Sequence, residues 1–534
     1  MQLTDTTVLA YIKELESNYE QRIKELENNY ERRIKESEYK YLEIKERYDL
    51  LLYKRFGRSA EQLLADEKQP LLFTDESKET EKTNKGPNEF TEIKSHKRNK
   101  GGRKPIDPKL RREEITIDIP ESEKTCACGA KLSQIGAETS ERLQIIPPKI
   151  YVEKIIRPKY ACRHCEGTGD EGKPTVRIAP VEPTIIPRSI VSPSLLSTII
   201  TQKFELHLPY FRQEKQFQSI GVTISRQDMS NWQQKAYKVL APIFVLLKET
   251  VKSGPVLQMD ETTVQVIGEE GRLDTQKSYM WLARGGPPGK TVLWYEYHES
   301  RAALHAKTFL QGYSGYVQTD GYDGYDAAVK ELPGIIHVGC FAHARRYFFE
   351  AAKITSNKSS TKPSSSEEGM NYIKTLYAIE KTVRDRYPLD EQKKMFLRVR
   401  QLCAWRPLKE FKEWLEKLND EVPPTSLLGK AIYYSLTQWD KLVMYLKSPY
   451  LTPDNNACEN AIRPFVLGRK NWLFAQSPDG AESSCGMFTL IETAKQNGLV
   501  PFEYLMNLFE KAPLTKNPDD WEKLLPWNFI YPKN

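Results

Sequence analysis

Three carboxylates stand at positions typical of a metal-dependent active site. Asp260 lies inside an apolar run that reads as a strand, Asp320 ends a second such run just before a glycine, and Glu459 lies near the start of an expected helix. Burying an acid in a hydrophobic strand is costly unless it is paired or liganded, and acids at the strand ends of an α/β sheet lie where sites form. Carboxylate oxygens suit Mg²⁺ (or Mn²⁺). Together they could hold two ions about 3.5–4 Å apart for in-line phosphoryl transfer.

Each acid also has a simpler interpretation. Asp260 could be an isolated buried acid that is satisfied by hydrogen bonds. Asp320 competes with Asp323 and Asp326, any of which could merely cap the next helix. Glu459 taken alone would be an ordinary acid on a helix surface. The three positions therefore gain their meaning from their shared context.

Four cysteines occur as two closely spaced pairs, C-x-C followed by C-x₂-C: Cys126, Cys128, Cys162 and Cys165. Four thiolates are the usual ligands of tetrahedral structural Zn²⁺, and they leave no open coordination position for a substrate. Eight cysteines in 534 residues are too few for a disulfide scaffold. The pattern indicates structural zinc in a reducing compartment, with four unliganded thiols as the alternative. Residues 141–160, between the pairs, alternate enough to predict a β-hairpin.

Basic and aromatic side chains accompany the acids along the sequence. Phosphate contacts from Arg and Lys position DNA, and the candidates near the acids are Arg345, Arg346, Arg463, Arg469 and Lys470. His343 either assists near a phosphate or caps local structure. Trp472 and Phe474 either stack on an unpaired base or pack in the core.

The first element that must position this chemistry is a long N-terminal helix with an 11-residue repeat. Ile12, Ile23 and Ile34 recur at that period, and no Pro or Gly interrupts residues 1–56. Eleven residues over three turns favour a nearly straight or slightly right-handed supercoil. Residues 1–65 are therefore predicted to form a coiled coil that joins copies of the chain. A solitary charged helix lying on the core is the alternative.

A polar, Gly- and Pro-containing segment at residues 66–115 is predicted to be a linker. Its residues 94–112 hold nine Lys or Arg and one Asp, against a net charge of +7 for the whole chain. A basic arm of this kind suits phosphates or a minor groove, and Arg103 and Lys104 are its candidate DNA contacts. A solubilising linker is the alternative.

Residues 185–250 are expected to contain a helix-turn-helix. One helix should end near Ile220, Gly221 should make the turn, and Ser225 can cap a second helix. Such a second helix can enter a major groove, so Arg226 in its first turn is a candidate DNA contact. A plain helical hairpin is the alternative.

The fold class is predicted to be multidomain α+β, with a mixed α/β catalytic core. Within residues 251–480 the pattern reads as three strands, a helix, a strand, a helix and a strand, which forms a mixed sheet. A helical insertion is expected at about 350–450. Residues 116–175 are predicted to form the zinc knuckle, and residues 481–534 are predicted to form a C-terminal helical region.

Taken in order, these segments resemble the transposases of the insertion sequence sixty-six family, a DDE-type group. The motifs that carry the resemblance are MDETTVQV, QTDGYDGYDA, GCFAHARRYFFEA and NNACENAIRPFVLGRKNWLFAQSPDGAESS. The match extends upstream to the zinc knuckle, to HLPYFRQEKQF with the helix-turn-helix, and to RFGRSAEQ after the coiled coil. It covers nearly the whole chain.

The resemblance implies an RNase H-like core whose triad is Asp260, Asp320 and Glu459, with Mg²⁺ as the cofactor. It implies double-stranded DNA partners, namely terminal inverted repeats and a target, together with small accessory proteins from the same element. Synapsis of two ends implies a homo-oligomer through the coiled coil. Two other functions stay open: an RNase H-like nuclease without strand transfer, and a DNA-binding regulator with an inert core.

Composition excludes several other classes of protein. No run approaches the roughly 20 apolar residues that a membrane helix needs, and the N-terminus lacks the pattern of a signal peptide. The chain holds 19 Phe, 28 Tyr and 9 Trp, too many for a disordered protein. We expect no membrane partner and a prokaryotic cytoplasmic location associated with the nucleoid.

Overall fold

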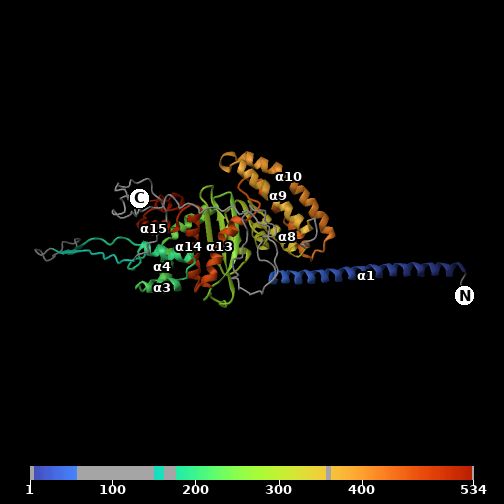
Figure 1. The fold of residues 1–534 in the computed structure, drawn as a ribbon, viewed down its shortest axis with the longest axis horizontal. Helices are drawn as coiled ribbons and strands as arrows, with labels where there is room; N and C mark the ends of the chain where they lie inside the picture. Colours follow the sequence, from blue (N-terminus) through green and yellow to red (C-terminus); the bar gives the residue numbers. More distant parts are fainter. Residues whose placement is uncertain (1–4, 57–149, 162–175, 356–362, 532–534) are drawn as a thin grey trace, which may run out of the picture. The chain divides into compact units, whose positions relative to one another are not determined.

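A computed structural model describes residues 5–56, 150–161, 176–355 and 363–531 (Figure 1). The four cysteines expected to bind zinc and the basic arm with Arg103 and Lys104 lie outside these residues, so the predictions about them stay predictions. The chain divides into two compact units, one of residues 65–181 and one of all the rest.

The described part of the first unit holds two short strands. β1 (Lys159–Ala161) pairs antiparallel with β2 (Val176–Ile178). Residues 150–158 form no strand. The hairpin expected within residues 141–160 is therefore wrong for its described part, because β1 takes its partner from beyond the second cysteine pair.

The N-terminal helix α1 (Asp5–Phe56) runs without interruption, as the absence of Pro and Gly predicts. Among the repeat's side chains that the structure describes, Ile23 is 55% and Ile34 is 58% exposed. Towards its end, Glu46 accepts a hydrogen bond of 2.8 Å from the backbone nitrogen of Leu427. The exposed apolar stripe leaves the coiled coil as a prediction, since its partner would be a second chain.

Between residues 176 and 255 the described chain forms four helices: α2 (Pro193–Phe204), α3 (Tyr210–Ser219), α4 (Arg226–Val239) and α5 (Ala241–Lys252). The turn between α3 and α4 follows the sequence expectation. Gly221 adopts a φ of 83° there, which a glycine reaches without a steric penalty. The Ser225 side chain accepts a 3.0 Å hydrogen bond from the Asp228 nitrogen and caps α4.

A five-stranded mixed sheet forms the centre of the second unit, as predicted. Its strands are β3 (Val256–Gln265), β4 (Lys277–Gly285), β5 (Val292–His298), β6 (Gly315–Gln318) and β7 (Ile335–Val338). Their order is β5-β4-β3-β6-β7. The first three are antiparallel neighbours, whereas β3, β6 and β7 run parallel. Helices α6 (Ala303–Leu310) and α7 (Asp323–Lys330) make the crossovers that parallel strands require.

Helices α13 (Asn456–Trp472) and α14 (Pro478–Gln496) lie against the sheet (Figure 1). α14 also satisfies the outer edge of β5, because Thr493 accepts a hydrogen bond from the Leu293 nitrogen and Thr489 accepts one from the Tyr295 nitrogen, at 3.1 and 3.0 Å. The domain boundary expected at residue 480 therefore falls inside a helix that belongs to the core.

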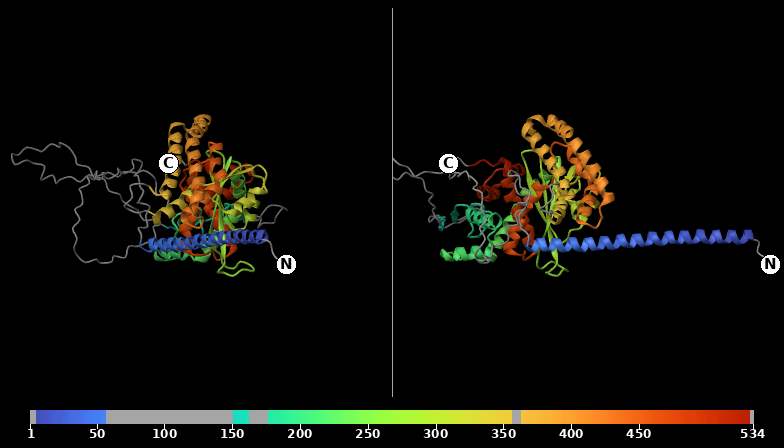
Figure 2. Two further views of the ribbon diagram at one scale, coloured as in Figure 1. Left: turned by 90° about the vertical axis from the view of Figure 1, so that its right-hand side faces the viewer. Right: turned by 45° about the vertical axis from the view of Figure 1, so that its right-hand side comes forward.

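The helical insertion begins with α8 (Phe341–Thr355) and continues through α9 (Ser365–Arg386), α10 (Leu389–Glu421), α11 (Leu427–Thr437), α12 (Trp439–Leu442) and η3 (Val443–Lys447). Figure 2 shows the bundle in yellow and orange beside the sheet. It has its own apolar core, which includes Phe348, Phe411 and Trp439. A helical insertion between the second and third acids is thus observed, close to the expected bounds.

The chain ends in α15 (Pro501–Lys511), η4 (Ala512–Leu514), α16 (Pro518–Glu522) and η5 (Pro526–Asn528). Within the described ranges, no helix combines the length and the apolar character that crossing a bilayer requires.

Candidate active site

The sheet brings the two predicted aspartates to the same end of neighbouring strands. Gln258 of β3 and Gln318 of β6 are register partners in a parallel pair. Asp260 and Asp320 each follow two residues later. Because parallel strands run in the same direction, both acids lie at one edge of the sheet. Backbone hydrogen bonds then orient them: Glu261 N donates to Asp260 Oδ1 at 2.9 Å, and Tyr322 N donates to Asp320 Oδ1 at 3.1 Å.

The third acid arrives on α13, whose first turn carries Glu459. A hydrogen bond holds the start of that helix next to the first aspartate: the Asn455 side-chain amide donates to the carbonyl oxygen of Met259 at 2.9 Å. Asn455 N also donates to Cys340 Sγ at 3.2 Å, just before α8 begins. Three segments that lie far apart in sequence therefore meet at one place.

The electrostatics of the three acids show that they share one environment. Burial raises the pKa of Asp260 well above its ordinary value, and the negative charges of Glu261, Glu459 and Asp320 raise it further. Burial also raises the pKa of Glu459, where Arg346 opposes the effect and Asp320 adds to it. A cation among these carboxylates would favour their ionised forms.

Buried oxygen atoms without hydrogen-bond partners also indicate that divalent metal ions fit this site. Glu459 Oε1 is buried and has no hydrogen-bond partner, and the same holds for the neighbouring Asn456 Oδ1. Buried polar atoms without partners are rare in native proteins and call for an explanation such as an ion. Asp260, Asp320 and Glu459 are the residues that would hold Mg²⁺ or Mn²⁺ here.

An ion pair with a buried carboxylate lies beside the acids and was missed by the sequence reasoning. Glu261 is only 2% exposed at its side chain and accepts hydrogen bonds from Arg301 Nε at 2.6 Å and from the Tyr325 hydroxyl. Arg301 Nη2 also lies 3.9 Å from Asp320 Oδ2. Arg301 thus compensates the charge of Glu261 and stands next to the second aspartate. The available signal was an acid adjacent to Asp260 in a buried strand, which demands a cation.

A chain of buried amides beneath the acids was missed as well. Gln258 Nε2 donates to Gln318 Oε1 at 2.9 Å, and Gln318 Nε2 donates to the carbonyl oxygen of Thr452 at 2.8 Å. Arg284 Nη1 donates to Gln258 Oε1 at 3.0 Å. The chain joins β3, β6 and the segment before α13, which are the three carriers of the acids. It holds those carriers in register, and each amide is buried.

His343 lies next to the third acid, in the first turn of α8. Its Nδ1 is 3.7 Å from Glu459 Oε1, and Arg346 Nη2 is 3.6 Å from Glu459 Oε2. Burial lowers the pKa of His343 to about 4, Arg346 lowers it further, and Asp320 opposes them. His343 is therefore neutral at physiological pH, and it lies beside the third acid.

The predicted DNA contacts that the structure describes differ in how exposed their side chains are, and one of them, Arg469, is held against β3 by hydrogen bonds. Arg226 is exposed in the first turn of α4, and Arg346 and Lys470 are also exposed, whereas Arg345 and Arg463 are half-buried. Arg469 differs, because its Nη1 donates to Thr262 Oγ1 at 3.1 Å and to Thr263 Oγ1 at 2.9 Å and so ties α13 to β3.

The two aromatic residues of this segment also separate. Trp472 contacts Phe204 and Phe488, with ring centroids 6.3 and 6.1 Å away, so it packs in the core as the alternative interpretation held. Phe474 is 41% exposed. Of the two, Phe474 is the one whose exposure leaves base stacking open.

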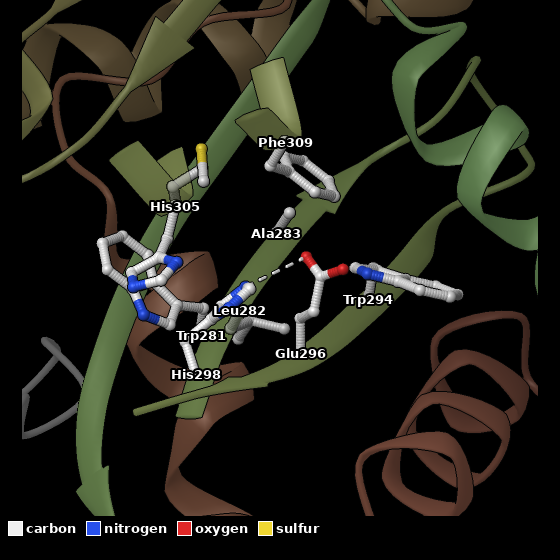
Figure 3. A pocket seen from close by; sticks show the side chains of 9 residues that line it. Trp281, Leu282, Ala283, Trp294, Glu296, His298, His305 and Phe309 are labelled. Atoms are coloured by element: carbon white, nitrogen blue, oxygen red, sulfur yellow. Dashed lines mark ion pairs between the residues drawn. The ribbon is translucent and has the colours of Figure 1, made fainter. Parts of the chain in front are cut away.

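A separate pocket lies over β4 and β5 (Figure 3). The rings of His298 and His305 stack there, with centroids 4.1 Å apart, and His298 Nε2 lies 3.7 Å from Glu296 Oε2. Its lining residues are Met259, Trp281, Leu282, Ala283, Trp294, Glu296, His298, His305 and Phe309. They include none of the three acids, so the site described above does not depend on this pocket.

Comparison with protein families gives four matches along the chain. Residues 188–483 match the model of the transposase IS66 family, and residues 489–527 match the IS66 C-terminal element. Residues 123–166 match the zinc-finger binding domain of transposase IS66. Residues 43–115 match the model described as transposase C of IS166 homeodomain.

Curated relatives cover most of the chain. The uncharacterized protein y4hP of Sinorhizobium fredii (strain NBRC 101917 / NGR234) is 31% identical over 455 residues, which make up 82% of this chain and 78% of that protein. The uncharacterized protein y4jD of the same organism is 30% identical over 431 residues, or 79% of this chain and 80% of that protein.

Proposed function

The chain belongs to the IS66 family of transposases, and from this we propose that Asp260, Asp320 and Glu459 form its catalytic triad for DNA strand cleavage and strand transfer. The proposal rests on one observation: Asp260 and Asp320 follow a pair of register partners on two parallel strands. The hydrogen bond from Asn455 to the carbonyl oxygen of Met259 then brings the start of α13, which carries Glu459, to the same place. The strand order β5-β4-β3-β6-β7 supports an RNase H-like core, with the helical insertion placed before the third acid.

The proposed reaction has two steps. A water attacks the phosphodiester at each 3′ end of the element, which frees a 3′-hydroxyl. That hydroxyl then attacks a phosphodiester of the target, bonds to its phosphorus and displaces the target's 3′-oxygen as a hydroxyl. Two divalent ions, when bound, supply activation of the attacking oxygen and stabilisation of the leaving oxygen. Arg301 pairs with Glu261, so the negative charge of Glu261 does not compete with the triad for the metal ions. The positive charge of Arg346 beside Glu459 favours binding of a phosphate.

Recognition of the terminal inverted repeats is assigned to the elements before the sheet. The α3–turn–α4 pair presents Arg226 at the start of its second helix, which suits entry into a major groove. The zinc knuckle at 116–175 and the basic arm within 66–115 would add contacts to the DNA backbone.

Assembly and location follow from the same proposal. Dimerisation through the coiled coil at 1–65 would bring two ends together, and small accessory proteins of the element are further partners. The proposal carries with it a nucleoid-associated location in a prokaryotic cytoplasm, where the DNA substrates lie.

A strand-transfer assay with the full chain, Mg²⁺ and DNA that carries the element's ends tests this function. Asp260→Asn and Glu459→Gln should lose at least about 10³-fold in both cleavage and joining, because each removes a charged metal ligand. Asp323→Asn is the matched control, since Asp323 is exposed on α7, and it should keep wild-type rates.

Other outcomes of the assay point to the alternatives. Nicked products without joined ones would indicate a nuclease that lacks strand transfer. Binding of the DNA ends with no cleavage by any variant, the wild type included, would indicate a regulator with an inert core.

A further inference from the structure

Cys340, His343 and Glu459 form a mixed-donor cluster that the proposed reaction does not explain. One ligand atom from each of the three lies within 4.8 Å of the other two. We propose that this cluster binds one soft divalent cation of the Zn²⁺ class, separate from the four-cysteine site. The site would share one ligand, Glu459, with the proposed triad.

The local structure delivers two of the donors from one turn of chain. Cys340 immediately precedes α8 and His343 is the third residue of that helix, so the C-x₂-H spacing puts both at the same helix end. The third donor comes from α13, whose start is fastened to this end. Phe341 N donates to the carbonyl oxygen of Pro453 at 2.9 Å, and Asn455 N donates to Cys340 Sγ at 3.2 Å.

The distances suit a small tetrahedral ion. His343 Nδ1 and Glu459 Oε1 lie 3.7 Å apart, and two ligands each about 2.0–2.1 Å from a tetrahedral Zn²⁺ would be about 3.3 Å apart. For this pair the difference is a few tenths of an ångström, and the Cys340 sulfur lies within 4.8 Å of both atoms. Both atoms are buried and lack hydrogen-bond partners in the structure, so a cation between them would satisfy both.

The donor types select the ion. A thiolate and an imidazole favour Zn²⁺ and related ions over Mg²⁺, which prefers oxygen. Cys340 is fully buried. Burial raises the pKa of its thiol, the negative charges of Glu459 and Asp454 raise it further, and the N–H groups of Asn455 and His343 oppose them, so the charge of the bound cation itself would have to stabilise the thiolate. On binding, the thiol proton passes to solvent. The thiolate and the Glu459 carboxylate then balance the charge of the cation, and the fourth position stays open to water.

Zinc stoichiometry of the full-length protein tests the proposal. After removal of metal with a chelator and reloading with excess Zn²⁺, zinc per chain is counted by mass spectrometry in the wild type, Cys340→Ser, His343→Ala and Cys403→Ser. Cys403 is the matched control, because it is an exposed free cysteine on α10. The four-cysteine site is intact in every variant, so differences report on this cluster alone.

The proposal predicts one zinc ion fewer per chain in Cys340→Ser and in His343→Ala, with Cys403→Ser equal to the wild type. Cobalt loading gives a second readout, since Cys340→Ser should lose part of the sulfur-to-cobalt charge-transfer absorption. Circular dichroism of each variant checks that the fold is retained, and His343→Ala decides if Cys340→Ser fails to fold. Equal zinc in all four proteins would overturn the proposal. The count needs no DNA, so it stands or falls independently of the transposase reaction.

Discussion

Replacement of Gln318 by methionine tests whether the buried amide chain holds the site together. Gln318 is fully buried and accepts a hydrogen bond from Gln258 Nε2. It donates to the carbonyl oxygen of Thr452 at 2.8 Å and, at a longer 3.3 Å, to that of Gly339. Methionine has a similar length but offers neither group. The variant would leave Gln258 Nε2 and the Thr452 oxygen buried without partners.

The magnitude follows from those two groups. Each buried polar group that loses its partner costs about 1–3 kcal/mol, so Gln318→Met should cost about 2–6 kcal/mol locally. Because the chain has several parts, a single unfolding midpoint is not the right measure. Hydrogen exchange of peptides covering β6 and residues 450–456 reports local opening directly. A loss of about 2 kcal/mol corresponds to exchange about 30-fold faster there.

Two comparisons make this prediction sharp. Gln392→Met, at an exposed position on α10, should leave exchange in both peptides unchanged. Gln318→Met and Gln258→Met each remove the hydrogen bond between the two amides. The double variant removes that bond only once, so it should destabilise the site clearly less than the sum of the two single variants. Wild-type exchange in Gln318→Met would refute the reasoning, as would strict additivity in the double variant.

Two further predictions concern buried charges elsewhere. Arg400 is fully buried and donates to Glu380 and to three backbone carbonyls. Arg400→Met should therefore destabilise the helical insertion by about 3–5 kcal/mol, measured by hydrogen exchange of α9 and α10 peptides. A loss below about 1 kcal/mol would contradict this. Burial lowers the pKa of Lys203 to about 7, so the penalty for burying its charge is complete below pH 7 and disappears as the pH rises toward the unfolded value near 10.5. Lys203→Met should therefore stabilise the fold more at pH 6.5 than at pH 10, measured as the protection of α2 peptides from hydrogen exchange after correction for the intrinsic rate at each pH, and a gain that grows with pH would contradict this sign.

Local patterns predicted the elements that carry the site. The apolar runs around Asp260 and Asp320 indicated strands, and Ser225 and Gly221 indicated the cap and the turn between α3 and α4. These features depend on neighbours in sequence, which is why they can be recognised without a structure. The convergence of Glu459 with the aspartates was raised as a possibility by the residue types, and it gained its support from the family resemblance.

The partners of the site could not be predicted, because they depend on contacts across long stretches of chain. The hydrogen bond between Gln318 and Thr452 joins residues 134 positions apart, and that between Asn455 and Met259 joins residues 196 apart. The interpretation of Arg469 as a DNA contact shows the same limit. Its basic neighbourhood suggested phosphate, whereas its bonds to Thr262 and Thr263 depend on how α13 docks on β3.

The most direct test of the triad is to locate its metal ions. Crystals of the full chain with DNA that carries one end of the element would be soaked in Mn²⁺, and anomalous scattering would locate the bound ions. The proposal predicts two peaks about 3.5–4 Å apart, held by Asp260, Asp320 and Glu459. Saturating Mn²⁺ with DNA bound and no peak at these carboxylates would contradict it.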